Sequence, residues 1–350
     1  MQRAIALGFF DGVHLGHQAL VRRTVERGAE RGFLPAVFTF DRSPREFVTG
    51  LPVPLLTTAE ERRRAVESLF PGTEVIVAPF DRAMMTMGWE DFVRMLVRRY
   101  QAGWLVAGHD FRFGHKNAGT PKLLERMAAE LELGCDIIPA VTLDGVTVSS
   151  THIRALLERG ETEEAARFLG RPFAIAGPVR HGKGIGSSRL GWPTVNLVPD
   201  ERQLVPAYGV YAARVTVAGR TYPAVTNVGV RPTVDTDGGM TVESHLLEEA
   251  ADLYGAGCRV EFLRMLRPER RFESLEDLRA QIARDAEAAR ACLAGEKTGG
   301  GERNGAHCTH DLFRAHCLWR RRPWRKRACG CRRHFLYRLR DFRHKSEPAE

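Results

Sequence analysis

Long apolar runs are missing from this sequence of 350 residues, and none approaches the roughly 20 residues that a membrane-spanning helix needs. The first residues also lack a basic stretch followed by an apolar one, so we expect no secretory signal and a cytoplasmic location. Cysteine is scarce, and the three cysteines before residue 296 are scattered, which argues against a disulfide framework and fits a reducing compartment. Lysine is equally scarce there, occurring only at positions 116, 122 and 183.

Net charge is distributed unevenly along the chain. The whole sequence has a formal net charge of +9, and the segment from Glu296 to Glu350 accounts for it, with 15 Lys and Arg against 6 Asp and Glu. The residues before this segment are balanced in charge. Their composition therefore gives no reason to expect nucleic-acid binding by the body of the protein.

The C-terminal segment 295–350 differs in composition from everything before it. It opens with a glycine-rich stretch and continues with arginines between aromatic residues, a composition typical of disorder. Such a tail could bind nucleic acid or an acidic surface. Zinc binding is a further alternative, but no paired-ligand framework appears among Cys308, His310, Cys317, Cys329 and Cys331.

The first 150 residues alternate short apolar runs with helical patterns. The expected strands are Ala4–Leu7, Leu34–Phe40, Glu74–Ala78, Trp104–Ala107 and Asp136–Pro139, and the expected helices are His17–Gly28, Glu60–Leu69, Glu90–Tyr100 and Pro121–Leu133. This alternation predicts a Rossmann-like α/β fold, in which a parallel sheet carries helices on both faces. Ligands bind such sheets outside the carboxyl ends of the strands, where residues 8–17 are located.

The pattern changes after residue 150. Two short helices, Thr151–Gly160 and Glu161–Leu169, precede β-rich runs broken by glycine and proline, and these runs predict a small antiparallel β-barrel. The expected barrel strands are Phe173–Gly177, Val210–Val217, Thr221–Val225, Thr241–His245 and Arg259–Leu263, followed by a closing helix over Ser274–Ala294. We therefore expect an α/β domain over 1–157, a linker helix over 158–170, a barrel domain over 171–294 and the tail over 295–350.

The motif GFFDGVHLGH combines three glycines and two histidines directly after a strand. Gly8, Gly12 and Gly16 let the backbone approach a phosphate closely. His14 and His17 are three residues apart at an expected helix start, so both rings lie on one side of its first turn. Imidazoles and helix-terminal N–H groups suit the negative charge that builds on phosphates during nucleotidyl transfer. We interpret this motif as a phosphate-handling loop rather than an ordinary strand-to-helix turn.

A second glycine-rich motif, GKGIGSSRLGWPTVNL, lies at 182–197. A kinase step needs phosphates that are held in line and neutralised. Gly182, Gly184 and Gly186 make a loop that can wrap phosphates, and Lys183 supplies a compact positive charge. A solvent-exposed loop lysine explains the same pattern equally well, so the loop alone does not settle the chemistry.

Several blocks of the first half resemble one family. HLGH at 14–17 resembles the HxGH motif of the HxGH nucleotidyltransferase superfamily, and FDGVHLGH resembles the adenylyltransferase module of bifunctional riboflavin kinase/FAD synthetases. TFDRSPREF at 39–47, GHDFRFG at 108–114 and VSSTHIR at 148–154 match further blocks in order. The resemblance implies an FMN adenylyltransferase in which His14 and His17 are catalytic. The substrate-binding residues that it implies are Gly8, Asp11, Gly12, Gly16, Asp110, Phe111, Ser149, Ser150, Thr151 and Arg154.

The second half resembles riboflavin kinases. PTVN at 193–196 matches their PTxN motif, and YGVYAARV, VTNVGVRPTV and VESHLLEEAADLYG match later blocks in order. The resemblance implies that Thr194 and Asn196 hold Mg²⁺ and ATP phosphates, and that Glu243 takes the proton of the ribityl 5′-hydroxyl. Oxygen donors suit a hard cation, and a carboxylate suits a general base. The further binding residues that it implies are Gly182, Lys183, Gly184, Gly186, Pro193, Asn227 and Arg231.

The two resemblances together imply a bifunctional enzyme of flavin-cofactor synthesis. It would use ATP and Mg²⁺ to convert riboflavin into FMN, and a second ATP to convert FMN into FAD and diphosphate. Two alternatives stay open: a riboflavin kinase with an impaired adenylyltransferase domain, and a nucleic-acid-binding protein that acts through its tail. The first interpretation implies small-molecule substrates, no membrane partner and no nucleic acid outside the tail. The sequence does not indicate an oligomeric state.

Overall fold

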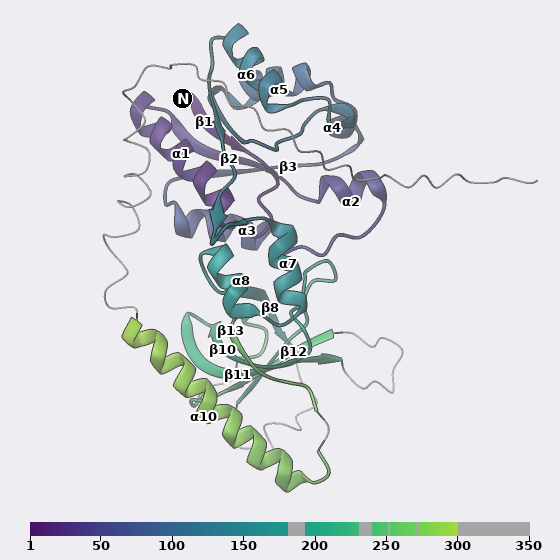
Figure 1. Ribbon diagram of the computed structural model, residues 1–350, viewed down its shortest axis with the longest axis vertical. Coiled ribbons are helices and arrows are strands. Elements are labelled where there is room, and N and C mark those ends of the chain that lie inside the picture. Colours follow the sequence, from purple (N-terminus) through teal and green to yellow (C-terminus); the bar gives the residue numbers. More distant parts are fainter. Residues whose placement is uncertain (181–192, 231–239, 251–252, 271, 300–350) are drawn as a thin grey trace, which may run out of the picture. The chain divides into compact units, whose positions relative to one another are not determined.

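Five strands in the first half of the computed structural model form one parallel sheet in the order β3-β2-β1-β4-β5 (Figure 1). The strands are β1 (Arg3–Leu7), β2 (Leu34–Phe40), β3 (Glu74–Ala78), β4 (Ala102–Gly108) and β5 (Gly134–Ile138). Central β1 pairs in parallel with β2 on one side and β4 on the other. The loop after β1 therefore leaves the sheet at its topological switch point. The predicted α/β fold is confirmed.

The structure describes residues 1–180, 193–230, 240–250, 253–270 and 272–299. Met1–Thr298 make up one compact unit. Within the described ranges no helix combines the length and the apolar character needed to cross a membrane. The expected tail lies outside the described residues from position 300 onward.

Eight α-helices precede the barrel in the described part of the chain. They are α1 (Leu15–Arg31), α2 (Pro44–Thr49), α3 (Ala59–Leu69), α4 (Arg82–Thr86), α5 (Trp89–Tyr100), α6 (Pro121–Glu130), α7 (Ser150–Glu158) and α8 (Thr162–Leu169), with a short 3₁₀ helix η1 (His115–Asn117) before α6. Sequence reasoning missed α2 and α4. Both are shorter than two turns, so their sequences show no hydrophobic periodicity. The available sequence signals were their N-capping residues, Ser43 and Asp81.

Side chains of β1 alternate between the two faces of the sheet. Ile5 and Leu7 share a core cluster with Phe92 of α5. Ala6 packs on the opposite face with Val21 of α1. These side chains are almost fully buried, and burying a large one contributes about 1.5–3 kcal/mol. The packed sheet gives the loop after β1 a rigid base.

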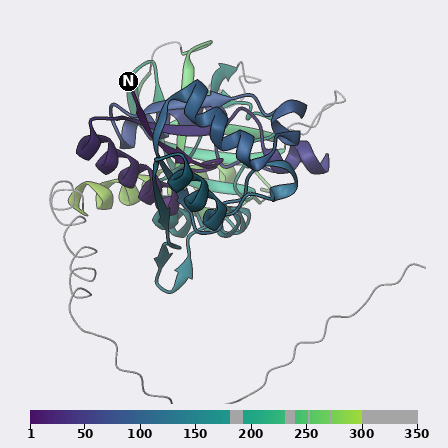
Figure 2. The same cartoon turned by 90° about the horizontal axis from the view of Figure 1, so that it is seen from above.

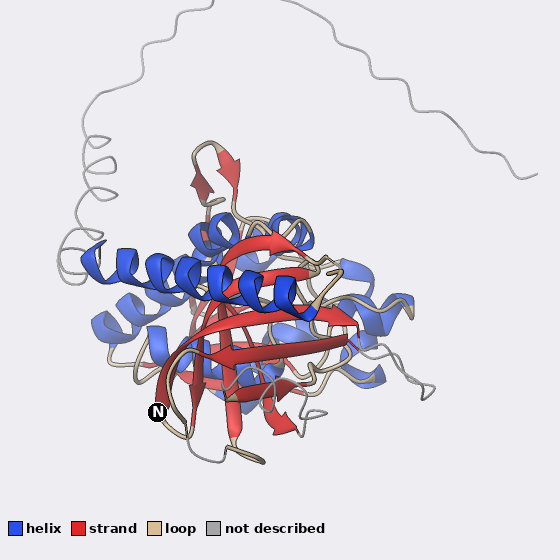
Figure 3. Cartoon of the chain, turned by 90° about the horizontal axis from the view of Figure 1, so that it is seen from below, coloured by secondary structure: helices blue, strands red, loops and turns tan. Residues whose placement is uncertain are grey.

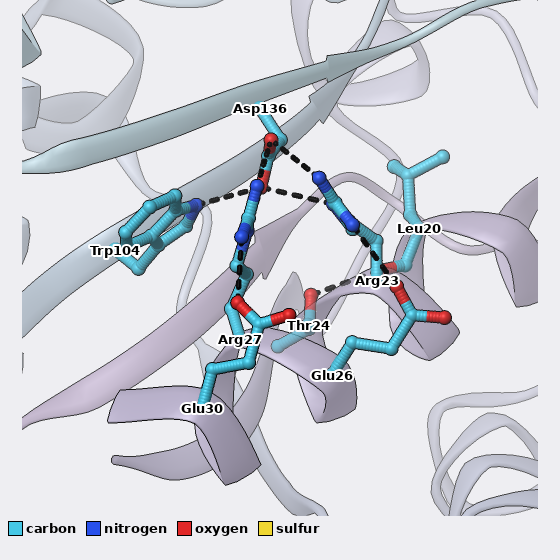
Figure 4. Close-up of polar contacts among 8 residues, drawn as sticks. All are labelled: Leu20, Arg23, Thr24, Glu26, Arg27, Glu30, Trp104 and Asp136. Carbon is cyan, nitrogen blue, oxygen red and sulfur yellow. Dashed lines mark hydrogen bonds and ion pairs between the residues drawn. The ribbon is translucent and has the colours of Figure 1, made fainter. Parts of the chain in front are cut away.

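An ion-pair cluster fastens α1 to the sheet (Figure 4). Asp136 on β5 accepts hydrogen bonds from Arg27 Nε at 2.7 Å, from Arg23 Nε at 3.1 Å and from Trp104 Nε1 at 2.8 Å. The Arg27 guanidinium also lies over the Trp104 ring, 4.5 Å from its centroid. Burial would raise the pKa of Asp136, but these hydrogen bonds outweigh burial and lower that pKa from 3.8 to about 2. The cluster fixes the orientation of α1, which carries the predicted histidines at its start.

A small hairpin leads into α7. Its strands β6 (Thr142–Leu143) and β7 (Val146–Thr147) pair antiparallel, and both residues of the Asp144-Gly145 turn have positive φ. An aspartate followed by glycine is a favoured sequence for such a tight turn. The hairpin projects from the body of the chain (Figures 2 and 3).

Six antiparallel strands of the second half close into a barrel in the order β10-β11-β12-β9-β8-β13. They are β8 (Phe173–Arg180), β9 (Thr194–Leu197), β10 (Gly209–Val217), β11 (Arg220–Val230), β12 (Met240–Leu246) and β13 (Gly257–Pro268). The predicted barrel is confirmed. Helix α10 (Leu275–Gly299) lies across its strands in Figure 3 and packs Ala286 and Ala289 against Val210 of β10. It continues to Gly299, beyond the Ala294 expected from the sequence.

Candidate active sites

The predicted phosphate loop connects the end of β1 to the start of α1. Gly8 follows β1 directly, and its N–H donates to the carbonyl of Phe38 on β2. Gly12 has a φ of +84°, and a Cβ there would lie 2.7 Å from Leu56 Cδ1. Only glycine fits this position without a shift of its neighbours. Val13 adopts a φ of 43°, so the loop makes a tight left-handed turn immediately before the histidines.

The two histidines of the loop stack on each other. Their ring centroids are 3.6 Å apart and their planes differ by 15°. His14 is the N-cap of α1, because its Nδ1 accepts a hydrogen bond from the backbone N–H of His17 at 3.3 Å. A Cβ at Gly16 would lie 3.2 Å from the His14 ring, so the glycine makes room for it. The spacing of three residues brings the rings together as predicted.

Both imidazoles are electrically neutral near pH 7. Burial, followed by the charge of Arg171, lowers the pKa of His14 from 6.5 to about 4. Burial also lowers the pKa of His17 well below its usual value, with His14 and Arg62 acting in the same direction. His17 Nδ1 is buried without a hydrogen-bond partner among the described residues. A neutral ring with one unused nitrogen remains able to donate or accept a hydrogen bond.

The predicted SST motif begins α7 next to this loop. Ser149 is the N-cap, and its hydroxyl accepts from the backbone N–H of His152 at 3.2 Å. The Ser150 hydroxyl donates to the carbonyl of Asp11 at 2.9 Å. Thr151 is exposed in the first turn. The motif therefore caps a helix and borders the phosphate loop at the same time.

Buried Asp11 forms an ion pair with half-buried Arg154. Arg154 Nη2 donates to Asp11 Oδ2 at 2.6 Å, and Arg154 Nε donates to the carbonyl of Pro54 at 2.7 Å. The Asp11 carboxylate also accepts from the backbone N–H groups of Leu56 and Thr57, at 3.1 and 3.0 Å. The carboxylate of Asp11 thus contacts protein donors, and its predicted role in substrate binding stays a prediction.

Asp110 and Phe111 follow the carboxyl end of β4. The Asp110 side chain is exposed, and its charge raises the pKa of His14 against the larger effect of burial. Phe111 stacks on Phe113 with ring centroids 5.2 Å apart. Both residues belong to the same edge of the sheet as the loop after β1, because neighbouring parallel strands end on one side.

Arg62 is a residue that sequence reasoning missed. It is completely buried on α3, where its Nη1 donates to Thr39 Oγ1 and to the carbonyl of Phe40. Its guanidinium lies 4.2 Å from the centroid of the Phe9 ring in the loop. Nε and Nη2 have no hydrogen-bond partner in the described part of the chain, and burial lowers the Arg62 pKa to about 10. Its position four residues before buried Val66, on the inner face of α3, was the available signal.

Three predicted kinase residues lie side by side on adjacent barrel strands. Asn196 of β9 pairs with Glu243 of β12, and Glu243 pairs with Asn227 of β11. Residues paired directly across strands project from the same face of the sheet. The alternate positions, such as Val242, belong to the apolar barrel core. The row of polar side chains therefore lies on the face opposite that core.

Thr194 extends this row, together with a histidine that the sequence analysis did not identify. Thr194 pairs with His245, and Thr194 Oγ1 lies 3.2 Å from His245 Nδ1. Burial lowers the pKa of His245, whereas the charge of Glu243 raises it. The available signal was the spacing of two between Glu243 and His245, which places both on one face of a strand.

Of the remaining predicted kinase residues, Pro193 lies within the described ranges. The carbonyl of Pro193 accepts from the backbone N–H of Leu246 at 2.9 Å, which fixes the entry to β9. The predicted residues that lie outside the described ranges are Gly182, Lys183, Gly184, Gly186 and Arg231.

Comparisons with known proteins match both halves. The family models described as FAD synthetase and riboflavin kinase match residues 1–152 and 169–293. The bifunctional riboflavin kinase/FMN adenylyltransferase of Pseudomonas fluorescens is 40% identical over 289 residues, covering 82% of this chain and 92% of that protein. Its counterpart from Escherichia coli K12 is 39% identical over 287 residues, covering 80% and 90%. A crystal structure described as a macrolide-efflux protein from Streptococcus pneumoniae has a TM-score of 0.73 at 28% identity, covering 83% and 94%.

Proposed function

Because the chain belongs to the bifunctional riboflavin kinase/FMN adenylyltransferase family, we propose which residues carry each of its two reactions. The enzyme phosphorylates riboflavin with ATP to give FMN, and it joins FMN to AMP from ATP to give FAD and diphosphate. We assign adenylyl transfer to residues 1–157 and the kinase reaction to residues 171–294. The separate family matches on either side of residues 153–168 support this division.

Adenylyl transfer is assigned to the loop after β1. The phosphate of FMN is already a nucleophile, so the protein mainly aligns it with the α-phosphorus of ATP and stabilises the charge that develops. His14 and His17 donate hydrogen bonds to the phosphates, and the glycines of the loop allow their close approach. The single observation that carries this assignment is the stacked, neutral histidine pair at the start of α1.

The β- and γ-phosphates of ATP are assigned to the start of α7. Ser150 and Thr151 offer hydroxyls there, and the helix N-terminus favours an anion. Arg154 adds a charge-assisted fork in the following turn. Asp110 and Phe111, at the end of β4, are assigned to the flavin side of the site.

The kinase reaction is assigned to the polar row on the barrel. Glu243 takes the proton from the ribityl 5′-hydroxyl as it attacks the γ-phosphorus of ATP. Asn227 and His245 flank this carboxylate and orient it. The register that places Asn196 directly beside Glu243 supports the assignment.

Thr194 and Asn196 would hold Mg²⁺. Their oxygens fit a hard cation that takes one or two protein ligands and completes its coordination with phosphates and water. No group of three or more His, Cys, Asp or Glu side chains in the described residues forms a protein-only cage for a metal. When bound, the ion would neutralise the transferred phosphoryl group.

One assay tests the division of labour. The purified protein is supplied with riboflavin, ATP and Mg²⁺, and FMN and FAD are separated over time. The proposal expects FMN first and FAD afterwards. FMN without FAD would instead indicate a kinase with an impaired adenylyltransferase domain.

The tail is assigned no part in either reaction. A chain that ends at Gly299, where α10 ends, should retain both activities, and loss of either would contradict this. We also propose a cytoplasmic location, supported by the free thiols of Cys135 and Cys258.

A further inference from the structure

Arg171 connects the kinase half of the chain to the phosphate loop of the other half. It belongs to the segment 169–293 that the riboflavin kinase model matches. Its Nη2 nevertheless donates to the carbonyl of Gly12 at 2.8 Å, and its Nη1 donates to the carbonyl of Val13 at 3.2 Å. One guanidinium thus holds two consecutive carbonyls immediately before the histidine pair.

The junction around Arg171 is packed closely against the loop. Gln18 Nε2 donates both to the carbonyl of Val13 at 3.0 Å and to the carbonyl of Leu169 at 2.8 Å. A Cβ at Gly170 would lie 2.8 Å from Leu15 Cδ2. The end of α8 and the start of α1 are therefore in close contact, and a larger residue at position 170 would displace the Leu15 side chain.

The turn held by Arg171 has an unusual conformation. Gly12 and Val13 both have positive φ, which a β-branched residue such as valine rarely adopts. Such a conformation persists only when surrounding contacts determine it. The two hydrogen bonds from Arg171 and the one from Gln18 supply those contacts.

The charge of Arg171 is not neutralised by direct contact. None of the ion pairs in the described ranges includes Arg171, and from farther away Arg259 repels it while Glu61 and Glu261 attract it. Burial lowers its pKa to about 10, so it remains a cation at neutral pH. Its charge is also the second-largest cause of the lowered pKa of His14. The guanidinium therefore acts electrostatically on the histidine pair.

We infer that Arg171 is a positioning residue for adenylyl transfer that the kinase segment contributes. It fixes the turn before His14 and places a positive charge behind the loop that receives the phosphates. The inference rests on the proposed role of this loop. It implies that an adenylyltransferase domain cut before residue 171 has an incomplete site.

The test uses the full-length protein and measures its two reactions separately. R171M should lower kcat for FAD formation from supplied FMN by about 100-fold, because misplacing reacting groups by about 1 Å costs this much. FMN formation from riboflavin should stay unchanged, which shows that the barrel half folds, and the far-UV circular dichroism of the variant should match that of the unaltered protein. The pKa of His14, followed by NMR, should rise from about 4 toward its ordinary value. R171K keeps the positive charge but lacks the guanidinium that bonds two carbonyls at once. The pKa of His14 should therefore stay low in R171K, and FAD formation should fall less than in R171M.

The matched control is R64M. Arg64 borders the same cavity of about 430 Å³ as Arg171 but is exposed and pairs with Glu60 and Glu61. This variant should leave FAD formation and the His14 pKa unchanged.

Three outcomes would overturn the inference. R171M could form FAD at the rate of the unaltered enzyme, or it could lose both activities equally, which would give Arg171 a general structural role. If R171M does not fold, the rates of FAD formation and FMN formation are compared in R171K instead. Unchanged FAD formation in R171K, or an equal loss of both reactions, would then overturn the inference. Undiminished FAD formation by H17A would instead refute the site itself, and the inference with it.

Discussion

Asp11 and Arg154 lie 143 positions apart in the sequence, yet their side chains form an ion pair of 2.6 Å. The aspartate belongs to the motif after β1, and the arginine belongs to the motif that starts α7. Asp11 is almost completely buried, so removal of Arg154 would leave an uncompensated buried charge and should be strongly destabilising. The ion pair fixes the distance between the two motifs to which we assign the phosphates of ATP.

R154K should weaken ATP binding in FAD formation. Lysine keeps the charge, but it cannot bond both the carbonyl of Pro54 and the carboxylate of Asp11 in the geometry of a guanidinium. Loss of one charge-assisted hydrogen bond, at about 1.5–3 kcal/mol, should raise KM for ATP about 10- to 100-fold. Steady-state kinetics with supplied FMN measure this, and an unchanged KM would contradict the assignment.

H17A should lower kcat for FAD formation by about 100-fold or more, because a donor to the developing phosphate charge is lost. FMN formation by the same preparation should be unaffected. H115A is the matched control, since His115 is exposed and its ring hydrogen-bonds the carbonyl of Met85. An equal effect of the two substitutions would refute the role of His17.

E243A should abolish FMN formation, because it removes the carboxylate that pairs directly with Asn196 and Asn227 in the polar row and is assigned to accept the proton. N196D should do the same by changing the charge next to the phosphates. In both variants FAD formation from supplied FMN should survive. The control is E248A, which removes an exposed glutamate of the same sequence block that pairs with Arg220. Loss of both reactions in folded E243A would show that the division of labour is wrong.

Acid should destabilise the protein through His14. Its pKa is about 4 in the folded protein and 6.5 when unfolded, so between these values only the unfolded state takes up the proton. The free energy of unfolding should therefore fall as the pH decreases from about 6.5 to about 4, by roughly 3 kcal/mol at most for this residue. Urea unfolding of H14N, which keeps a capping side chain, should show a weaker pH dependence. If the free energy of unfolding of H14N and of the unaltered protein depended equally on pH, the lowered pKa of His14 would be contradicted.

D136N should lower the free energy of unfolding by about 2 kcal/mol at neutral pH. The pKa of Asp136 is lowered to about 2 in the folded protein, so its stabilising effect is complete above about pH 4. That effect is lost as the pH falls toward 2, where variant and unaltered protein should converge. D91N is the control, because Asp91 is mostly exposed and pairs only with Arg94. Equal losses from both substitutions would refute the importance of the cluster.

Some elements followed directly from the sequence. The strands Leu34–Phe40 and Glu74–Ala78 have the predicted bounds, because each is an apolar run bounded by polar residues or turns. Helix α1 was expected from His17 but begins at Leu15. Its N-cap is a histidine rather than the usual Ser, Thr, Asp or Asn, so local capping rules did not mark its start.

The motifs located the polar residues of both sites, but not the groups that surround them. Arg62 and Arg171 come from other elements, and only tertiary packing brings them to the phosphate loop. Sequence spacing reports neighbours within one helix or strand, and it is silent about contacts across a fold. This explains why two histidine rings on one side of the first helical turn were expected, whereas the cations behind them were not.

Successive side chains of strand β12 point alternately to the polar face of the barrel and to its apolar core. Glu243 and His245 lie on the polar face, whereas Val242 and Leu246 belong to the barrel interior. Insertion or deletion of a single residue in this strand would turn a carboxylate toward the apolar core and a valine toward the face assigned to the kinase reaction. Unless a β-bulge absorbs it, such a change therefore disturbs the assigned kinase site and the packing of the barrel at the same time.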